Sequence, residues 1–179
     1  MKGWFKIEGT QGGLRNLSDQ TVGLEILYRN ASGKTVLDLG CAEGLISNWL
    51  VCSGASMADG VDCDKERIKV GKEVVHSRVN LHVGDLNNLF SLITLSLKRS
   101  YDIVLLLGIL HKVERTDELL NYAIRHCGRW LAIRAPSKVL NNLDIFEHLM
   151  ISGFGVVHEV ENVNPDLGGK SWLGLFVRE

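Results

Sequence analysis

Two carboxylates flank the first glycine-rich turn of the chain, which runs over residues 38–44 as Asp-Leu-Gly-Cys-Ala-Glu-Gly. Glycines in such a turn let the backbone approach a ligand closely. The acids Asp38 and Glu43 would repel a pyrophosphate, which a dinucleotide places on a glycine loop and the helix after it. The turn also lacks the G-x-G-x-x-G spacing of dinucleotide-binding proteins. It therefore indicates a ligand that carries positive charge.

Two further acids follow expected strands later in the chain. Asp62 comes after residues 56–61, and Asp85 follows residues 79–83 after one glycine. The carboxyl ends of parallel strands meet at one edge of an α/β sheet, where ligands bind. Carboxylates gathered at that edge favour a ligand rich in hydrogen-bond donors. Each acid could instead cap the helix that follows it, and capping is the role that we assign to Asp64.

Alternating apolar patterns predict the elements that bring these acids together. Short apolar runs indicate strands, and apolar residues at helical spacing indicate helices between them. Residues 103–107, within the run 102–107, are continuously apolar, as in a central parallel strand that is covered on both faces. The expected strands are residues 35–39, 56–61, 79–83, 102–107 and 129–134, and the expected helices are residues 18–30, 45–51, 64–78, 86–97, 114–127 and 137–152.

The alternation stops near the C-terminus. The strand-like runs 154–160 and 172–177 have no helix between them, so they are expected to pair as an antiparallel hairpin. The pattern predicts an α/β domain with a doubly wound seven-stranded sheet, mostly parallel, with an antiparallel C-terminal hairpin strand and helices on both faces. Residues 1–34 would form an N-terminal lid segment and first helix, and residues 35–179 the ligand-binding core.

Four segments, in this order along the chain, resemble motifs of the class I S-adenosylmethionine-dependent methyltransferases. Residues 36–44 resemble the first motif, residues 60–64 the second and residues 83–86 the third. Residues 101–111 resemble the strand and loop that border the transferred methyl group. The match in spacing continues to the C-terminus and covers about four-fifths of the chain.

The resemblance implies that the chain binds S-adenosyl-L-methionine and transfers its methyl group to an oxygen or nitrogen acceptor. It implies that Asp62 accepts hydrogen bonds from the ribose hydroxyls, and that Asp85 accepts one from the adenine amino group. Asp38 would orient the turn or meet the cofactor's amino group. Ala42 stands where many members have glycine. The implied cofactor-binding residues are Asp38, Gly40, Cys41, Ala42, Glu43, Gly44, Asp62, Cys63, Gly84, Asp85, Leu86, Leu107 and Gly108.

His111 is the candidate general base. It follows the expected strand 102–107, and an ordinary imidazole pKa of about 6.5 suits proton removal near neutral pH. A role in shaping the cofactor loop is equally open, because methyl transfer can proceed without a catalytic side chain. Arg134 and Lys138, near the end of the fifth strand, could contact an acidic substrate or could be solvated surface charges.

Several acceptor classes lack their usual features in this chain. The strand 102–107 is not followed by the Asn- or Asp-Pro-Pro-aromatic turn of enzymes that methylate base amino groups. An acidic cluster that could hold a divalent metal is also missing there, so we expect no metal site. Residues 4–15, with two aromatics and a glycine pair, are expected to act as a lid, and the hairpin loop 162–172 to stand beside the site. The open site that results could be completed by a large substrate, a second copy of the chain or a partner subunit.

The bulk composition excludes several other classes of protein. The chain has 179 residues and a formal net charge of −1 without a long basic run, so a strong general affinity for nucleic acid is not indicated. We expect a single domain, no membrane span and a cytoplasmic location. The four separate cysteines indicate reduced thiols, not a zinc site or a disulfide framework.

Three alternatives to a methyltransferase remain open from the sequence. A non-catalytic subunit or sensor that binds S-adenosylmethionine would share every cofactor residue and lack turnover. Another reaction on the same cofactor, such as aminopropyl transfer, is compatible with the same motifs. A nicotinamide-dependent oxidoreductase is disfavoured by the acidic glycine turn and the terminal hairpin.

Overall fold

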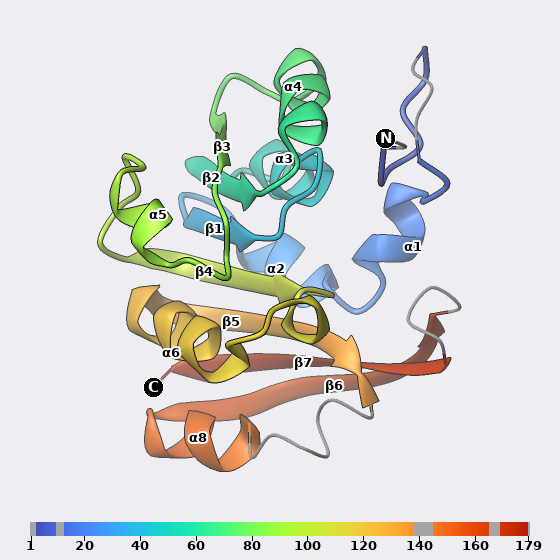
Figure 1. Cartoon of the computed structure of the whole chain (residues 1–179). Helices are drawn as coiled ribbons and strands as arrows, with labels where there is room; N and C mark the ends of the chain where they lie inside the picture. The colour runs from blue at the N-terminus through green and yellow to red at the C-terminus, as the bar shows by residue number, and fades with distance from the viewer. Residues whose placement is uncertain (1–2, 10–12, 138–144, 165–168, 179) are drawn as a thin grey trace.

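A single seven-stranded sheet organises the computed structural model, which describes residues 3–9, 13–137, 145–164 and 169–178 (Figure 1). The strand order is β3-β2-β1-β4-β5-β7-β6. The five strands from β1 to β5 are parallel, and β7 runs antiparallel to both β5 and β6, so the predicted fold class is confirmed. The strands are β1 (Thr35–Leu39), β2 (Met57–Asp62), β3 (Val79–Val83), β4 (Tyr101–Leu107), β5 (Cys127–Pro136), β6 (Phe154–Asn164) and β7 (Gly169–Arg178).

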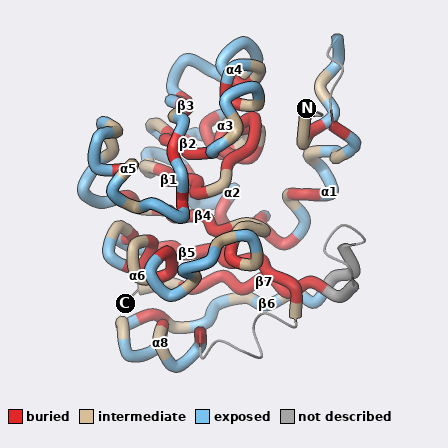
Figure 2. The backbone as a smooth tube through the Cα atoms, in the orientation of Figure 1, coloured by how far each residue is buried: buried red, intermediate tan, exposed pale blue. Residues whose placement is uncertain are grey.

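Helices cover both faces of the sheet. Leu50 of α3 and Ile68 of α4 belong to a buried apolar cluster on one face, and Leu92 of α5 and Leu149 of α8 belong to a second cluster on the other. Figure 2 shows the buried strands between helices whose outer sides are exposed. The described part of the chain has no helix long and apolar enough to cross a membrane. The helices are α1 (Leu17–Thr21), α2 (Glu25–Asn30), α3 (Leu45–Cys52), α4 (Lys65–Val74), α5 (Phe90–Ile93), the 3-10 helix η1 (Leu110–Lys112), α6 (Thr116–His126) and α8 (Ile145–Ile151).

The register of the central strands aligns their carboxyl ends. Leu39 of β1 lies beside Val61 of β2, and Asp38 lies beside Leu105 of β4. The glycine-rich turn, the end of β2 and the loop after β4 therefore leave the sheet at one edge, as the sequence predicts. The N-terminal segment and α1 lie at this same edge, toward which the arrows of β1 and β4 point (Figure 1).

The first predicted helix, over residues 18–30, is in fact two helices. Gly23 separates α1 from α2 with a φ of 83°, a backbone conformation that favours glycine. The break leaves the carbonyl oxygens of Gln20 and Val22 to accept hydrogen bonds from the Arg134 guanidinium, at 2.7 and 2.8 Å. The apolar stripe predicted one continuous helix because it holds no information about this distant partner.

The third predicted helix, over residues 86–97, is reduced to the single turn α5. The Asp85 carboxylate accepts a hydrogen bond from the backbone N–H of Asn87 at 2.9 Å, and the Ser91 hydroxyl donates to the Asp85 carbonyl at 3.1 Å. Such local bonds from Asp and Ser compete with helical hydrogen bonds. The chain therefore forms a turn where the apolar spacing alone predicts a helix.

Helices α4 and α6 are shorter than predicted, α8 ends one residue before the end of the expected range 137–152, and α3 extends one residue beyond the expected range 45–51. The predicted cap is confirmed at α4, where the Asp64 carboxylate accepts hydrogen bonds from the N–H groups of Glu66 and Arg67. The predicted helix 137–152 corresponds to α8, and its residues 138–144 lie outside the described part.

The terminal hairpin is confirmed, and its strands are longer than predicted. Pairing between β6 and β7 continues to Asn164 beside Gly169, so much of the expected loop 162–172 is strand. The expected loop residues 165–168 lie outside the described part. A ladder of backbone hydrogen bonds can extend through polar residues, which a prediction based on apolar runs assigns to a loop.

A buried carboxylate joins three strands below the site. Asp59 of β2 accepts hydrogen bonds from the Tyr101 hydroxyl at 2.7 Å and from the Asn80 amide at 3.1 Å. His82 Nε2 lies 3.2 Å from the same carboxylate. These contacts satisfy a charge that would be costly to bury alone.

Removal of the Tyr101 hydroxyl should destabilise the fold. Tyr101→Phe is expected to lower the free energy of unfolding by about 1–3 kcal/mol, because a buried carboxylate loses a donor. Chemical denaturation would measure this change. The matched control is Tyr122→Phe on α6, where the half-buried ring stacks on His126, and we expect a smaller loss there. Equal losses in the two variants would contradict the role of the hydroxyl.

Candidate functional site

A cavity of about 160 Å³ opens at the carboxyl edge of the sheet. Its wall combines the N-terminal segment with the turn after β1, the end of β2, the start of α4, and the loops after β3 and β4. Eight residues that the sequence assigned to cofactor binding line it, namely Gly40, Ala42, Asp62, Cys63, Asp85, Leu86, Leu107 and Gly108. The remaining lining residues are Trp4, Arg67, Asn87, Ile109, Lys112 and Val113.

A second, smaller cavity of about 30 Å³ shares part of the same wall. Trp4 and Ala42 line both cavities. Two more residues from the predicted set, Asp38 and Cys41, line the second cavity together with Arg134. The fold thus brings ten of the thirteen predicted residues to two adjoining cavities.

The three other predicted residues line neither cavity. Gly44 caps α3 with a φ of 75°, and a Cβ there would lie 2.6 Å from the Leu81 side chain. A Cβ on Gly84 would lie 2.8 Å from the Val61 side chain. Both glycines are thus explained by packing of the turns, whereas the carboxylate of the third residue, Glu43, bonds to the N-terminal segment.

The Asp62 carboxylate connects the glycine-rich turn to the end of β2. One oxygen accepts a hydrogen bond from the backbone N–H of Ala42 at 2.9 Å, and the other accepts one from the N–H of Asp64 at 2.9 Å. Ala42 has a φ of 51°, in the left-handed region that glycine prefers. Each Asp62 oxygen keeps a lone pair for a ligand donor.

Asp38 is a buried acid at the wall of the second cavity. The Ser47 hydroxyl donates a hydrogen bond to its carboxylate at 2.8 Å. Burial raises the pKa of Asp38 to about 7, a shift that the Ser47 bond opposes and the negative charge of Asp62 reinforces. Asp38 is therefore poised to lose its proton when a cation binds beside it.

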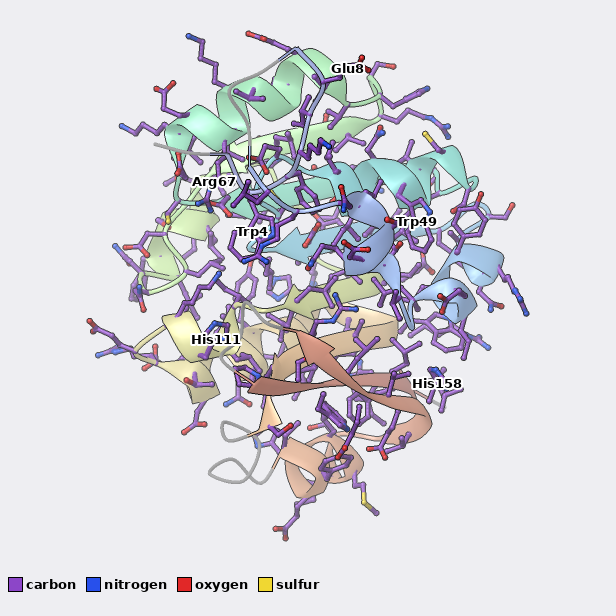
Figure 3. All side chains as sticks on the ribbon, turned by 90° about the vertical axis from the view of Figure 1, so that its right-hand side faces the viewer. Trp4, Glu8, Trp49, Arg67, His111 and His158 are labelled. Atoms are coloured by element: carbon purple, nitrogen blue, oxygen red, sulfur yellow. The ribbon has the colours of Figure 1, made fainter. Side chains whose placement is uncertain are left out.

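The N-terminal segment folds over the glycine-rich turn. The Glu43 carboxylate accepts hydrogen bonds from the backbone N–H groups of Trp4 at 2.6 Å and Phe5 at 3.2 Å. Phe5 also forms a β-bridge with Arg15, which closes the segment on itself. In Figure 3 the Trp4 side chain faces the viewer near Arg67. The segment thus has the position that a lid over the two cavities requires.

Loss of the Glu43 charge should release this segment. Glu43→Gln is expected to speed tryptic cleavage after Lys6 and Arg15 by about tenfold, because charge-assisted hydrogen bonds to two backbone donors are weakened. Native-state proteolysis would measure the rate. Glu73→Gln, on an exposed position of α4, is the matched control. Equal cleavage rates in the two variants would show that the Glu43 carboxylate does not hold the N-terminal segment in place.

The candidate base and the two candidate basic contacts have different positions. His111 lies in η1 and lines neither cavity, although its neighbour Lys112 lines the first one. Arg134 is buried, with both terminal nitrogens bonded to the backbone between α1 and α2, so it is not the solvated surface charge considered from the sequence. Lys138 lies outside the described residues.

Sequence reasoning did not single out the cations at the cavity mouth. Lys112 Nζ lies 4.5 Å from the centre of the Trp4 ring, and the guanidinium carbons of Arg15 and Arg67 lie 4.9 and 5.8 Å from it. The three cations come from separate elements and have no shared spacing in the sequence. The aromatic pair in the N-terminal segment was the available signal, and it indicated a lid without indicating its charge.

The strand order, the acidic glycine turn and the acids at the ends of β2 and β3 define a class I S-adenosylmethionine-dependent methyltransferase. The chain belongs to the family described as methyltransferase domain, whose model matches residues 30–169. S-adenosylmethionine is accordingly its cofactor. Comparison with curated protein sequences gives no significant match.

Solved structures share the fold at low sequence identity. The N-methyltransferase NodS from Bradyrhizobium japonicum, crystallised with S-adenosyl-L-homocysteine, is 12% identical with a TM-score of 0.70 over 90% of this chain and 86% of its own. Magnesium protoporphyrin IX methyltransferase from Synechocystis, crystallised with S-adenosylmethionine, is 19% identical with a TM-score of 0.69 over 90% and 77%. An S-adenosylmethionine-dependent methyltransferase from Mesorhizobium loti is 17% identical with a TM-score of 0.67 over 88% and 96%.

Proposed function

We propose that this methyltransferase transfers the methyl group to an oxygen or nitrogen acceptor that enters the mouth of the first cavity. The observation that carries the proposal is the convergence of ten motif residues on two adjoining cavities beneath the N-terminal segment. The acceptor would approach past Trp4 and Lys112, which line the mouth beside the end of β4.

The first cavity suits the adenosine part of the cofactor. Each Asp62 oxygen accepts one hydrogen bond from the backbone and has a second lone pair. The carboxylate could therefore accept hydrogen bonds from the two ribose hydroxyls. Asp85 is exposed on the same wall and would accept a hydrogen bond from the adenine amino group. Leu86 and Leu107 supply apolar wall on which a base can pack.

The second cavity suits the amino-acid part of the cofactor. Asp38 and Arg134 both line it, so a zwitterion would meet a carboxylate and a guanidinium. Arg134 Nε is buried without a hydrogen-bond partner among the described residues. A ligand carboxylate would satisfy such a donor, and the cofactor's ammonium would stabilise the ionised form of Asp38. The residues present thus fit S-adenosylmethionine at both ends.

The chain's own residues contribute binding, orientation and exclusion of water. When bound, S-adenosylmethionine supplies a methyl group on a cationic sulfonium that a nucleophile displaces in line. Asp62 and Asp85 would fix the adenosine, and the segment that carries Trp4 would close over it and exclude water. His111 stays a predicted base, which would take the acceptor's proton after movement toward the cavity.

Two measurements test this function. Calorimetric titration with S-adenosyl-L-homocysteine should show binding to one site, and absence of binding would overturn the cofactor assignment. S-adenosylmethionine should then be converted to S-adenosylhomocysteine in the presence of a panel of hydroxyl and amine acceptors. Tight binding without turnover on any acceptor would favour the non-catalytic subunit over the enzyme.

A further inference from the structure

The mouth of the first cavity concentrates positive charge around one aromatic ring. Lys112, Arg15 and Arg67 all approach the Trp4 indole within the range of cation–π contacts. Lys112 comes from η1, Arg67 from α4 and Arg15 from the N-terminal segment. Figure 3 shows Trp4 and Arg67 on the side of the molecule where the N-terminal segment crosses the site. The ring carries no net charge, so it does not neutralise the three cations.

Lys112 is a cation of this cluster whose ammonium has only the Trp4 ring as a contact among the described residues. The surrounding protein partly desolvates its ammonium and so lowers the pKa of Lys112, and repulsion from Arg67 lowers it further. Within the described part of the chain its contact is with the Trp4 ring, and no hydrogen bond or ion pair of its ammonium is found there. The side chain is nevertheless exposed and lines the cavity, so a ligand can reach it.

The acids near the cluster are already engaged in the fold. Arg67 Nε lies 3.4 Å from the Asp64 carboxylate, which caps α4, and this nitrogen is buried without a hydrogen-bond partner among the described residues. Asp62 attracts the charge of Lys112, but its oxygens hold the turn after β1 and the start of α4. Lys112 and Arg67 both line the cavity, and the described residues supply no hydrogen-bond or ion-pair partner for the Lys112 ammonium, so an anion could bind there.

We propose that the methyl acceptor carries an anionic group, a carboxylate or a phosphate, which binds to Lys112 and Arg67 with Arg15 at the outer side. This proposal rests on the proposed function and adds the chemical class of the substrate. The cofactor's own carboxylate has a separate partner in Arg134, which lines the second cavity, whereas Lys112 and Arg67 line only the first of these two cavities. An acceptor anion would also offset the repulsion between this cluster and a cationic sulfonium nearby.

The test measures anion binding to the protein saturated with S-adenosyl-L-homocysteine. Sodium phosphate and sodium acetate are titrated separately at constant ionic strength, and the indole N–H resonance of Trp4, assigned with Trp4→Phe, reports binding. We expect saturable binding of at least one anion, and the stronger of the two identifies a phosphate or a carboxylate acceptor. Lys112→Gln and Arg67→Gln should each weaken this binding by at least about tenfold.

The control is Lys69→Gln, which removes an exposed lysine from α4 outside the cavity lining and should leave anion affinity within about twofold. Unchanged binding in Lys112→Gln and Arg67→Gln, or no saturable binding in the parent, would overturn the proposal. Affinity for S-adenosyl-L-homocysteine is measured in every variant. A tenfold loss there in Lys112→Gln would assign the cations to the cofactor and also overturn the proposal, whereas failure of the parent to bind S-adenosyl-L-homocysteine would overturn the proposed function itself.

Discussion

Asp62→Ala is expected to lower the affinity for S-adenosyl-L-homocysteine by at least about 100-fold. The carboxylate holds the backbone N–H of Ala42 and that of Asp64, and it would also accept the ribose hydroxyls. Hydrogen bonds to a charged group contribute about 1.5–3 kcal/mol each, so loss of two ligand bonds exceeds two orders of magnitude in affinity. Release of the turn after β1 adds to the loss, and calorimetric titration would measure it.

A graded pair of variants separates this effect from general damage. Asp62→Asn keeps the size of the side chain and one acceptor oxygen, and we expect it to lose about tenfold in affinity. Asp117→Ala removes an exposed acid from the first turn of α6, outside the lining of both cavities, and should bind the ligand as the parent does. Parent-like affinity in Asp62→Ala would show that the ribose binds elsewhere.

The position of the site follows from short-range patterns that the sequence contains. A continuously apolar run such as 103–107 can be buried on both faces of a sheet, which identifies a central parallel strand. Once the strands are known, the topology of an α/β sheet brings their carboxyl ends to one edge. Asp62 and Asp85 therefore could be assigned to one cavity wall before any coordinates were known.

The interactions that the sequence did not predict depend on partners from distant segments. The sequence places Arg134 near the end of a strand and does not reveal its partners. Its guanidinium binds the backbone carbonyls of Gln20 and Val22, which the break between α1 and α2 leaves available. Glu43 lies within the recognised turn, yet its partners are N–H groups of the N-terminal segment. The three cations around Trp4 also come from distant segments. Residues that meet only in the folded chain have no fixed spacing in the sequence, so the sequence did not predict this cluster.

The second large effect is expected at Asp38, where binding and stability oppose each other. The usual pKa of an aspartate is 3.8, whereas burial raises that of Asp38 to about 7 in the folded protein. A raised pKa means that folding favours the protonated form. Its stabilising contribution is complete below pH 3.8 and is lost as the pH rises through about 7. The ligand-free protein should therefore lose on the order of 4 kcal/mol from this group between those limits.

Asp38→Asn should abolish this dependence, because the amide stays neutral and its oxygen can still accept the hydrogen bond from Ser47. At pH 8 the ligand-free variant is expected to be more stable than the parent by up to about 4 kcal/mol, and at pH 4 the two should differ by less than about 1 kcal/mol. Urea denaturation at both pH values would measure the difference. Asp85→Asn, at an exposed acid of the first cavity, is the control and should show neither effect.

The same substitution should weaken cofactor binding, because the neutral amide gives no charge to the cofactor's ammonium. Parent affinity for S-adenosyl-L-homocysteine should rise as the pH increases through about 7 and Asp38 ionises, and it should then level off. Binding near pH 7 should release a proton from Asp38, which calorimetry in two buffers of different ionisation enthalpy detects. Asp38→Asn should show lower affinity and no proton release from this position. If Asp38→Asn gained stability at pH 8 and kept parent-like affinity, the negative charge of Asp38 would destabilise the fold without contributing to cofactor binding. That result would contradict the assignment of Asp38 to the cofactor's ammonium.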